Sequence, residues 1–93
     1  MAIPREIKAV HVRRAGVRIG RDGIPSSRHS TRYDVVVDDE RLPPKYVLSV
    51  ACELATGRHL LPGDFSGGAE ANGFLRQLGF AIVDKRGRVV ASP

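Results

Sequence analysis

The sequence predicts an α+β domain in which three helices pack on a small sheet of short, mostly antiparallel strands. Apolar residues recur at helical spacing in three separate segments, and short valine-rich runs lie between or after them. Each helical segment is followed by a glycine, and the valine-rich runs are bounded by turn residues. With 93 residues the chain has room for one modest core, so residues 1–93 are expected to form a single domain.

A first helix is predicted over residues 8–21, because its apolar residues recur with helical period. The apolar stripe consists of Val12, Ala15, Gly16 and Ile19. Three arginines are spaced i, i+4 and i+7 and are therefore expected to share one exposed face: Arg14, Arg18 and Arg21. Gly23 and Pro25 mark the end of this helix.

A polar, basic loop at residues 26–32 precedes a predicted β-hairpin. Residues 33–37 are rich in β-branched side chains and form its first strand, residues 38–40 an acidic turn, and residues 41–42 the returning arm. A second helix is predicted over residues 44–56. It begins at a proline that suits the first helical position, and it is apolar around much of its circumference, so we expect it to be central and buried.

The leucines and the phenylalanine of residues 60–65 are expected to fill the core from the connection that follows. A third helix is predicted over residues 69–78, where Ser66-Gly67-Gly68 precedes it and a glycine stops it. Strands at residues 80–83 and 88–91 then form a second hairpin around a charged turn. The predicted order is therefore α-β-β-α-α-β-β.

The positive charge of the chain is concentrated in its first third. The whole chain carries a net charge of +5, but residues 1–32 hold eight cations and two carboxylates, an excess of six, whereas residues 33–93 hold seven cations and eight carboxylates. Seven of the eight cations in the first third are arginines, whose planar guanidinium suits phosphate. Such an asymmetry is typical of polyanion binding, and a merely solvated basic surface is the alternative.

The sequence contains few of the features that catalysis or membrane insertion requires. No apolar run approaches the roughly 20 residues that span a bilayer. The single cysteine, Cys52, excludes an internal disulfide and fits a reducing cytoplasm. His11, His29 and His59 do not have the spacing of metal ligands. We therefore expect no metal site, no cofactor and no enzymatic activity in these residues.

Two loops and one lysine are candidates for phosphate contacts. The loop Arg28–Arg32 combines cations with hydroxyl groups, which commonly hold phosphates without reading base sequence. Ser66-Gly67-Gly68 offers backbone N–H groups at a helix start, although the same residues also make an ordinary helix cap. Lys45 stands at the start of the second helix, either to meet an anion or to extend out of the core. The predicted DNA-contacting residues are Arg13, Arg14, Arg18, Arg21, Arg28, His29, Ser30, Arg32, Lys45, Ser66, Gly67 and Gly68.

Several segments resemble a known family. They are Arg-Tyr-Asp-Val-Val at 32–36, Leu-Pro-Pro-Lys-Tyr-Val-Leu-Ser at 42–49, Asp-Phe-Ser-Gly-Gly-Ala-Glu-Ala-Asn at 64–72 and Phe-Leu-Arg-Gln-Leu-Gly-Phe at 74–80. The chain resembles the amino-terminal head domain of actinomycete McrA-type restriction endonucleases, type IV enzymes that attack modified DNA. The resemblance extends from about Ile7 to Val83. Two departures stand out: Gly16 where a larger apolar residue is expected, and Asp39 in place of a turn glycine.

The resemblance implies that this chain is one module of a larger enzyme. In such enzymes the head is followed by domains that recognise phosphorothioated or methylated DNA and by a His-Asn-His nuclease domain. We therefore expect a non-catalytic, cytoplasmic module that contacts DNA phosphates through the basic helix and loop. The alternative is a protein-interaction or dimerisation module that docks on the sister domains, with the apolar second helix only partly covered by its own chain.

Overall fold

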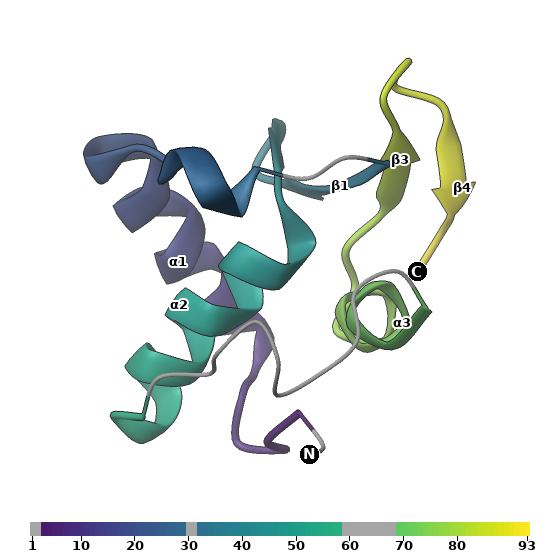
Figure 1. Cartoon of the computed structure of the whole chain (residues 1–93). Helices are drawn as coiled ribbons and strands as arrows, with labels where there is room; N and C mark the ends of the chain where they lie inside the picture. Colours follow the sequence, from purple (N-terminus) through teal and green to yellow (C-terminus); the bar gives the residue numbers. More distant parts are fainter. Residues whose placement is uncertain (1–2, 30–31, 59–68) are drawn as a thin grey trace.

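The computed structural model of the chain describes residues 3–29, 32–58 and 69–93. In these residues, three helices cover one face of a four-stranded antiparallel sheet with strand order β2-β1-β3-β4 (Figure 1). The predicted α+β class and element order are confirmed. The elements are α1 (Ala9–Asp22), a 3₁₀ turn η1 (Ser26–Arg28), β1 (Tyr33–Val37), β2 (Glu40–Leu42), α2 (Pro44–Thr56), α3 (Ala69–Gln77), β3 (Ile82–Asp84) and β4 (Val89–Ala91).

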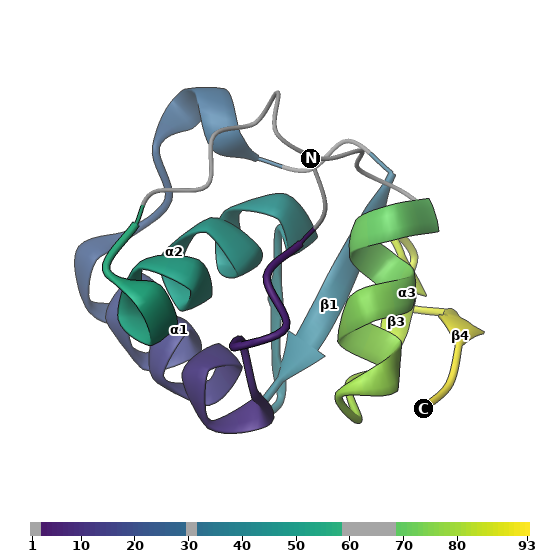
Figure 2. The same ribbon diagram turned by 90° about the horizontal axis from the view of Figure 1, so that it is seen from below.

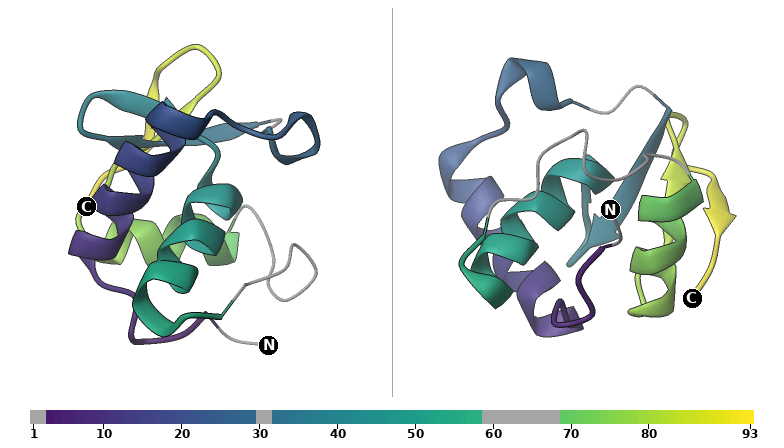
Figure 3. Two further views of the ribbon diagram at one scale, coloured as in Figure 1. Left: turned by 90° about the vertical axis from the view of Figure 1, so that its left-hand side faces the viewer. Right: turned by 60° about the horizontal axis from the view of Figure 1, so that its bottom comes forward.

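The strand β1 lies at the centre of the domain. Figures 2 and 3 show α1 and α2 side by side next to β1, with α3 on its other side over β3. Because side chains alternate along a strand, Val35 and Val37 point towards the helices while Asp34 and Val36 point away from them. The pairing of Val36 with Arg41 on β2 places that arginine on the face without helices.

The core fills the space between the helices and the inner face of the sheet. Its largest fully buried side chains come from all three helices, from β1 and β3 and from the segment before α1: Ile7, Val12, Val35, Val37, Val47, Leu48, Cys52, Leu75 and Ile82. Full burial of an aliphatic side chain of this kind stabilises the fold by about 1.5–3 kcal/mol. The apolar residues that recur periodically in the sequence therefore form the core between the helices and the sheet.

The helix α2 begins and ends where the sequence predicts. Pro44 occupies its first turn, and Gly57 ends it in a left-handed conformation, donating its N–H to the carbonyl of Glu53 at 2.9 Å. Val47 and Leu48 have no exposed surface, which confirms that the helix is central. The elements α1, β1 and α3 all pack against α2, while Leu54 in its second half is 40% exposed.

The helix α1 begins and ends one residue later than predicted, and Gly16 explains how closely it packs. A Cβ on Gly16 would lie 3.0 Å from Cγ1 of Val37 and 3.7 Å from Cδ1 of Leu42. The expectation of a larger apolar side chain at this position is therefore wrong. The missing side chain lets α1 approach the β1–β2 hairpin, and the hairpin occupies the volume that a larger residue would need.

The β1–β2 hairpin has a two-residue turn made of Asp38 and Asp39. Both residues have positive φ, 49° and 69°, as a turn of type I′ requires. Glu40, predicted to belong to the turn, is instead the first residue of β2 and pairs with Val37. Asparagine, aspartate and glycine tolerate this backbone best, so Asp39 fits where glycine was expected, with more strain than glycine would have.

The remaining elements are shifted by one or two residues from their predicted positions. The helix α3 ends at Gln77, and β3 starts at Ile82 rather than at Phe80. The backbone N–H of Phe80 bonds to the carbonyl of Leu75, which holds it in the connection after the helix. A register shift between Ile82 and Val83 disturbs the pairing of β3 with β4. Residues 60–65, whose apolar side chains were predicted to fill the core, lie outside the described residues.

Candidate nucleic-acid interface

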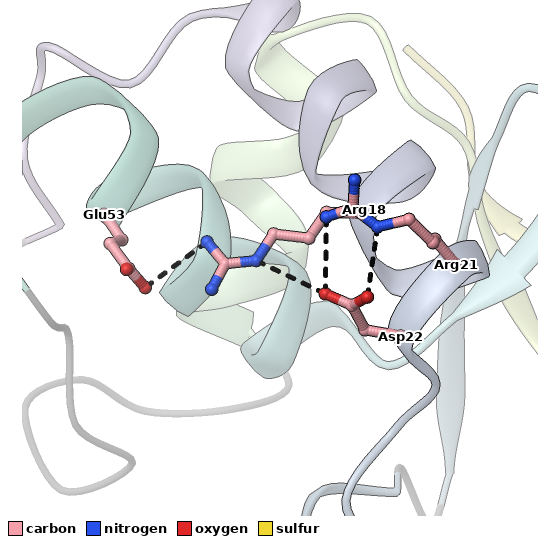
Figure 4. A network of polar contacts seen from close by, with 4 residues as sticks. All are labelled: Arg18, Arg21, Asp22 and Glu53. Atoms are coloured by element: carbon pink, nitrogen blue, oxygen red, sulfur yellow. Dashed lines mark hydrogen bonds and ion pairs between the residues drawn. The ribbon is translucent and has the colours of Figure 1, made fainter.

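The predicted arginine face of α1 consists of Arg14, Arg18 and Arg21, and two of the three are in ion pairs (Figure 4). Nη1 of Arg18 lies 3.6 Å from Oε2 of Glu53 on α2, and its Nε lies 3.9 Å from Oδ2 of Asp22. Arg21 binds the same Asp22 carboxylate, with Nε 3.1 Å from Oδ1. The three charges therefore do not act as a free cationic stripe.

The Arg21–Asp22 pair also changes how these groups titrate. The side-chain hydrogen bond from Arg21 lowers the pKa of Asp22 below its ordinary value, and the same bond raises the pKa of Arg21. Both groups are solvent-exposed, so the pair contributes little to stability. Arg14 differs from both neighbours: it is exposed, and it has no hydrogen bond or ion pair within the described ranges 3–29, 32–58 and 69–93.

Arg13 lies on a different flank of α1. Five residues separate it from Arg18, which places the two side chains about 140° apart around a helix. Its guanidinium carbon lies 5.8 Å from the centre of the Phe80 ring, close enough for a cation–π contact. Arg13 therefore points towards the connection between α3 and β3, while Arg18 points towards α2.

Arg28 ties the loop after α1 to the first half of α2. Its Nη2 donates a hydrogen bond to Oγ of Ser49 at 2.9 Å, and its guanidinium carbon lies 5.1 Å from the centre of the Tyr46 ring. Oγ of Ser49 in turn donates to the carbonyl of Lys45 at 3.0 Å. The loop, predicted to present its cations to solvent, thus uses one of them in the packing of the domain.

Other predicted contacts are more open to solvent. His29 and Arg32 are exposed, and Lys45 is half-buried on the first turn of α2. Because Arg28 lies over Tyr46, the residue that follows Lys45, the loop after α1 packs against the start of α2. Ser30 and the Ser66-Gly67-Gly68 segment lie outside the described residues. The exposed cations could meet phosphate oxygens without any rearrangement of the backbone.

The sequence interpretation missed two exposed valines on α1. Val10 is 50% exposed and Val17 is 70% exposed, and they lie seven residues apart, on the helix face that also carries Arg14. The signal was present in the sequence, because both valines fall off the buried stripe. The outer face of α1 is therefore mixed, with apolar and cationic side chains next to each other.

Neither a metal-binding cluster nor a membrane-spanning helix is found in the described residues. Among them, no group of three or more histidine, cysteine, aspartate or glutamate side chains is arranged to hold a metal ion. None of the helices in the same residues has the length and apolar character needed to cross a bilayer.

The chain matches the model of a known protein family. A family model described as the ScoMcrA-like N-terminal head domain matches residues 20–84, more than half of the chain. The chain belongs to this head-domain family. The resemblance to the head domain of McrA-type restriction endonucleases is thus confirmed. No curated protein and no solved structure matches the chain significantly.

The matched segment starts within α1 and so leaves out most of that helix. It begins at Gly20, near the end of α1, and not at about Ile7 as the resemblance had indicated. Most of the arginine face therefore precedes it, whereas the loop with Arg28, the hairpin and α2 lie inside it. Arg14 and Arg18 thus lie outside the matched residues.

Proposed function

We propose that this head domain is a non-catalytic DNA-binding module of a type IV restriction endonuclease that cleaves modified DNA, phosphorothioated or methylated. It contacts backbone phosphates of duplex DNA, and the cleaving and modification-reading domains belong to the rest of the enzyme. One observation carries the proposal: a head domain of this family has an excess of six positive charges in its first 32 residues.

The exposed cations are the ones proposed to contact phosphates first. Arg14 and Arg32 are exposed and have no ion pair among the described residues, so phosphate binding would not have to break an internal contact. Lys45 and His29 would add weaker contacts from the start of α2 and the loop. Arg13, Arg18, Arg21 and Arg28 have partners within the domain, and their share of the binding energy is smaller because those partners compete with phosphate.

Titration of a labelled 20-base-pair duplex, followed by fluorescence anisotropy at low and rising salt, tests this proposal. We expect binding at micromolar to tens of micromolar protein that weakens steeply with salt. Arg14→Ala with Arg32→Ala should weaken binding roughly tenfold at low salt and reduce the slope of log K against log salt by about two. The matched control, Arg58→Ala with Arg76→Ala, removes two exposed cations from the end of α2 and from α3 and should change binding far less.

The outcomes separate the possibilities. No binding at tens of micromolar in low salt would overturn the proposed function. Binding that falls equally in the control and in the Arg14 and Arg32 variant would show that only total charge matters, and would overturn the proposed residues. A nuclease assay of the chain with magnesium or manganese tests the non-catalytic assignment, for which we expect no cleavage above buffer.

A second candidate function is docking on the sister domains or on a second copy of the chain. The exposed valines of α1, Val10 and Val17, favour it, because apolar side chains between arginines are typical of protein interfaces. Val10→Ser with Val17→Ser should abolish co-purification with the remaining domains if α1 is the docking face, and should leave DNA binding unchanged. Light scattering of the isolated chain should report a monomer if the docking partner is a sister domain.

A further inference from the structure

A second group of cations lies at the β3–β4 hairpin, in the part of the sequence whose net charge is negative. Residues 33–93 have seven positive side chains, and four of them meet here: Arg41, Lys85, Arg86 and Arg88. We call these four residues the cationic tip. The hairpin turn that carries three of them stands clear of the sheet, on the side away from α2 and α3 (Figures 1 and 3).

The backbone of this turn is fixed by Asp84. Its Oδ1 accepts hydrogen bonds from the N–H groups of Arg86 and Arg88, both at 2.9 Å. These two backbone bonds, that of Arg88 first, lower the pKa of Asp84. The carboxylate is therefore directed at the main chain, while the side chains of Arg86 and Arg88 remain exposed and form no ion pair within the described ranges.

Lys85, the third cation of the hairpin turn, is held by the carboxylate of Asp34 on β1. Its Nζ lies 3.3 Å from Oδ1 and 3.4 Å from Oδ2 of Asp34, on the sheet face without helices. The Asp34 side chain is 10% exposed, whereas that of Lys85 is 48% exposed. The ammonium group is thus held in place and still reaches solvent.

Arg41 joins this group across the sheet. It lies on β2, at one edge, yet its Nη1 is only 3.3 Å from the position that a Cβ of Gly87 would take. Gly87 has φ of +84°, which favours glycine, and the absence of a side chain leaves room for the guanidinium. Arg41 and Gly87, 46 residues apart in sequence, therefore lie close together. The group contains four cations and two carboxylates, those of Asp34 and Asp84.

We infer that the cationic tip is a second phosphate-binding surface of the head domain, and that its ligand is the backbone of duplex DNA. The inference rests on the proposed function, since it takes DNA as the partner. Three of the four cations are arginines, which bind phosphate oxygens in pairs through a planar fork. A hairpin tip with fixed backbone and exposed cations can follow a phosphate backbone at little entropic cost, because only side chains have to be ordered.

The tip and the arginine face are independent in position, so variants can test them separately. Arg86→Ala with Arg88→Ala removes two cations of the tip and leaves Asp84 and the backbone unchanged. We expect about tenfold weaker binding of the 20-base-pair duplex at low salt and a salt slope smaller by about two. Arg86→Lys with Arg88→Lys should keep part of the affinity, because the charge remains without the planar fork. Arg58→Ala with Arg76→Ala is the control with equal loss of charge.

A titration of ¹⁵N-labelled chain with the same duplex gives a second readout. The amides of Arg86, Gly87 and Arg88 should shift on binding and should stop shifting in the Arg86 and Arg88 variant. Full binding by this variant, together with unshifted amides in the wild-type tip, overturns the second surface while the proposed function survives through Arg14 and Arg32. Loss of binding in the tip variant alone supports the tip and overturns the residues proposed on α1. No binding by the wild type overturns both.

Discussion

The arginine face of α1 and the cationic tip hold their positive charge in opposite ways. On α1 the cations are dense in sequence, but two of the three have carboxylate partners, Asp22 and Glu53, within the domain. At the tip the cations come from two distant segments, and the nearby carboxylates order the backbone and one lysine while two arginines stay exposed. The comparison teaches that charge density along a sequence does not measure the charge available to a ligand.

The same contrast separates arginines that stabilise the fold from those that can bind a partner. Arg28 and Arg13 lie over aromatic rings, and Arg28 also bonds to Ser49. Arg14, Arg86 and Arg88 are exposed. A partner that binds the first group must replace existing contacts, whereas a partner that binds the second group gains contacts without losing any.

Gly16→Val should have the largest effect on stability, because it acts on the contact that positions α1. The added Cβ would lie 3.0 Å from Cγ1 of Val37, closer than an ordinary contact, so the Val37 side chain has to shift by a few tenths of an ångström. We expect the free energy of unfolding, measured by urea titration, to fall by about 1–3 kcal/mol. Gly20→Ala is the control: its Cβ would lie 3.7 Å from Oε2 of Glu40, an ordinary contact, and should raise stability by up to about 1 kcal/mol. Equal losses in both variants would contradict the close-packing role of Gly16.

Arg28→Ala should cost about 1–2 kcal/mol of unfolding free energy, since it removes a part-buried hydrogen bond and a cation–π contact. Arg14→Ala, which removes an exposed arginine from α1, should stay within about 0.5 kcal/mol of the wild type. Thermal or urea unfolding of the two variants side by side measures the difference. If Arg14→Ala proved as destabilising as Arg28→Ala, the division between paired and available arginines would not hold.

Gly87→Ala should lower stability by about 1 kcal/mol, because alanine is strained at a φ of +84°. It should also displace Arg41, whose Nη1 lies 3.3 Å from the new Cβ position, and so weaken DNA binding at the tip. Arg41→Ala, with the turn intact, should weaken binding without the loss of stability. Unaltered DNA affinity in both variants would remove Arg41 from the cationic tip.

The smallest expected effect is the pH dependence that Asp22 and Asp84 contribute. Asp84 has its pKa lowered by the backbone N–H groups of Arg88 and Arg86, and Asp22 by its bond to Arg21. A lowered folded-state pKa stabilises the fold above the ordinary aspartate value of about 3.9, and the stabilisation is lost as pH falls through the folded-state value. The melting temperature should therefore drop below about pH 4, less steeply in Asp84→Asn than in the wild type. Asp22→Asn should flatten the curve less, because its partner is a solvent-exposed side chain. A larger effect at Asp22 would reverse this ranking of the two regions.

The periodicity of the sequence was sufficient to predict most of the fold. The helix α2 was predicted residue for residue, because proline at its start and glycine after its end fix both boundaries. The start of β3 was misplaced because Phe80 is apolar and buried like a strand residue, while its N–H is bonded to α3. Gly16 was misread because the volume available beside it depends on Val37 and Leu42, which belong to another element.

The candidate site was less predictable than the fold. The sequence located the arginines of α1 on one face, since their spacing is a local property of a helix. It did not indicate that Glu53 would neutralise Arg18, or that Arg28 would turn towards Tyr46, because both partners lie on α2. Nor did it indicate the cationic tip, since Arg41 and Arg88 stand in a region whose charges nearly cancel.

The α+β class, the order of the elements, the buried stripe of α1 and the family of the head domain could all be predicted from the sequence alone. These features depend on periodicity, turn residues and short motifs, which are local along the chain. Which cations are paired and which are exposed depends instead on how the elements pack together. Ion pairs and cation–π contacts join residues that are far apart in sequence, and their geometry exists only after the helices have packed on the sheet.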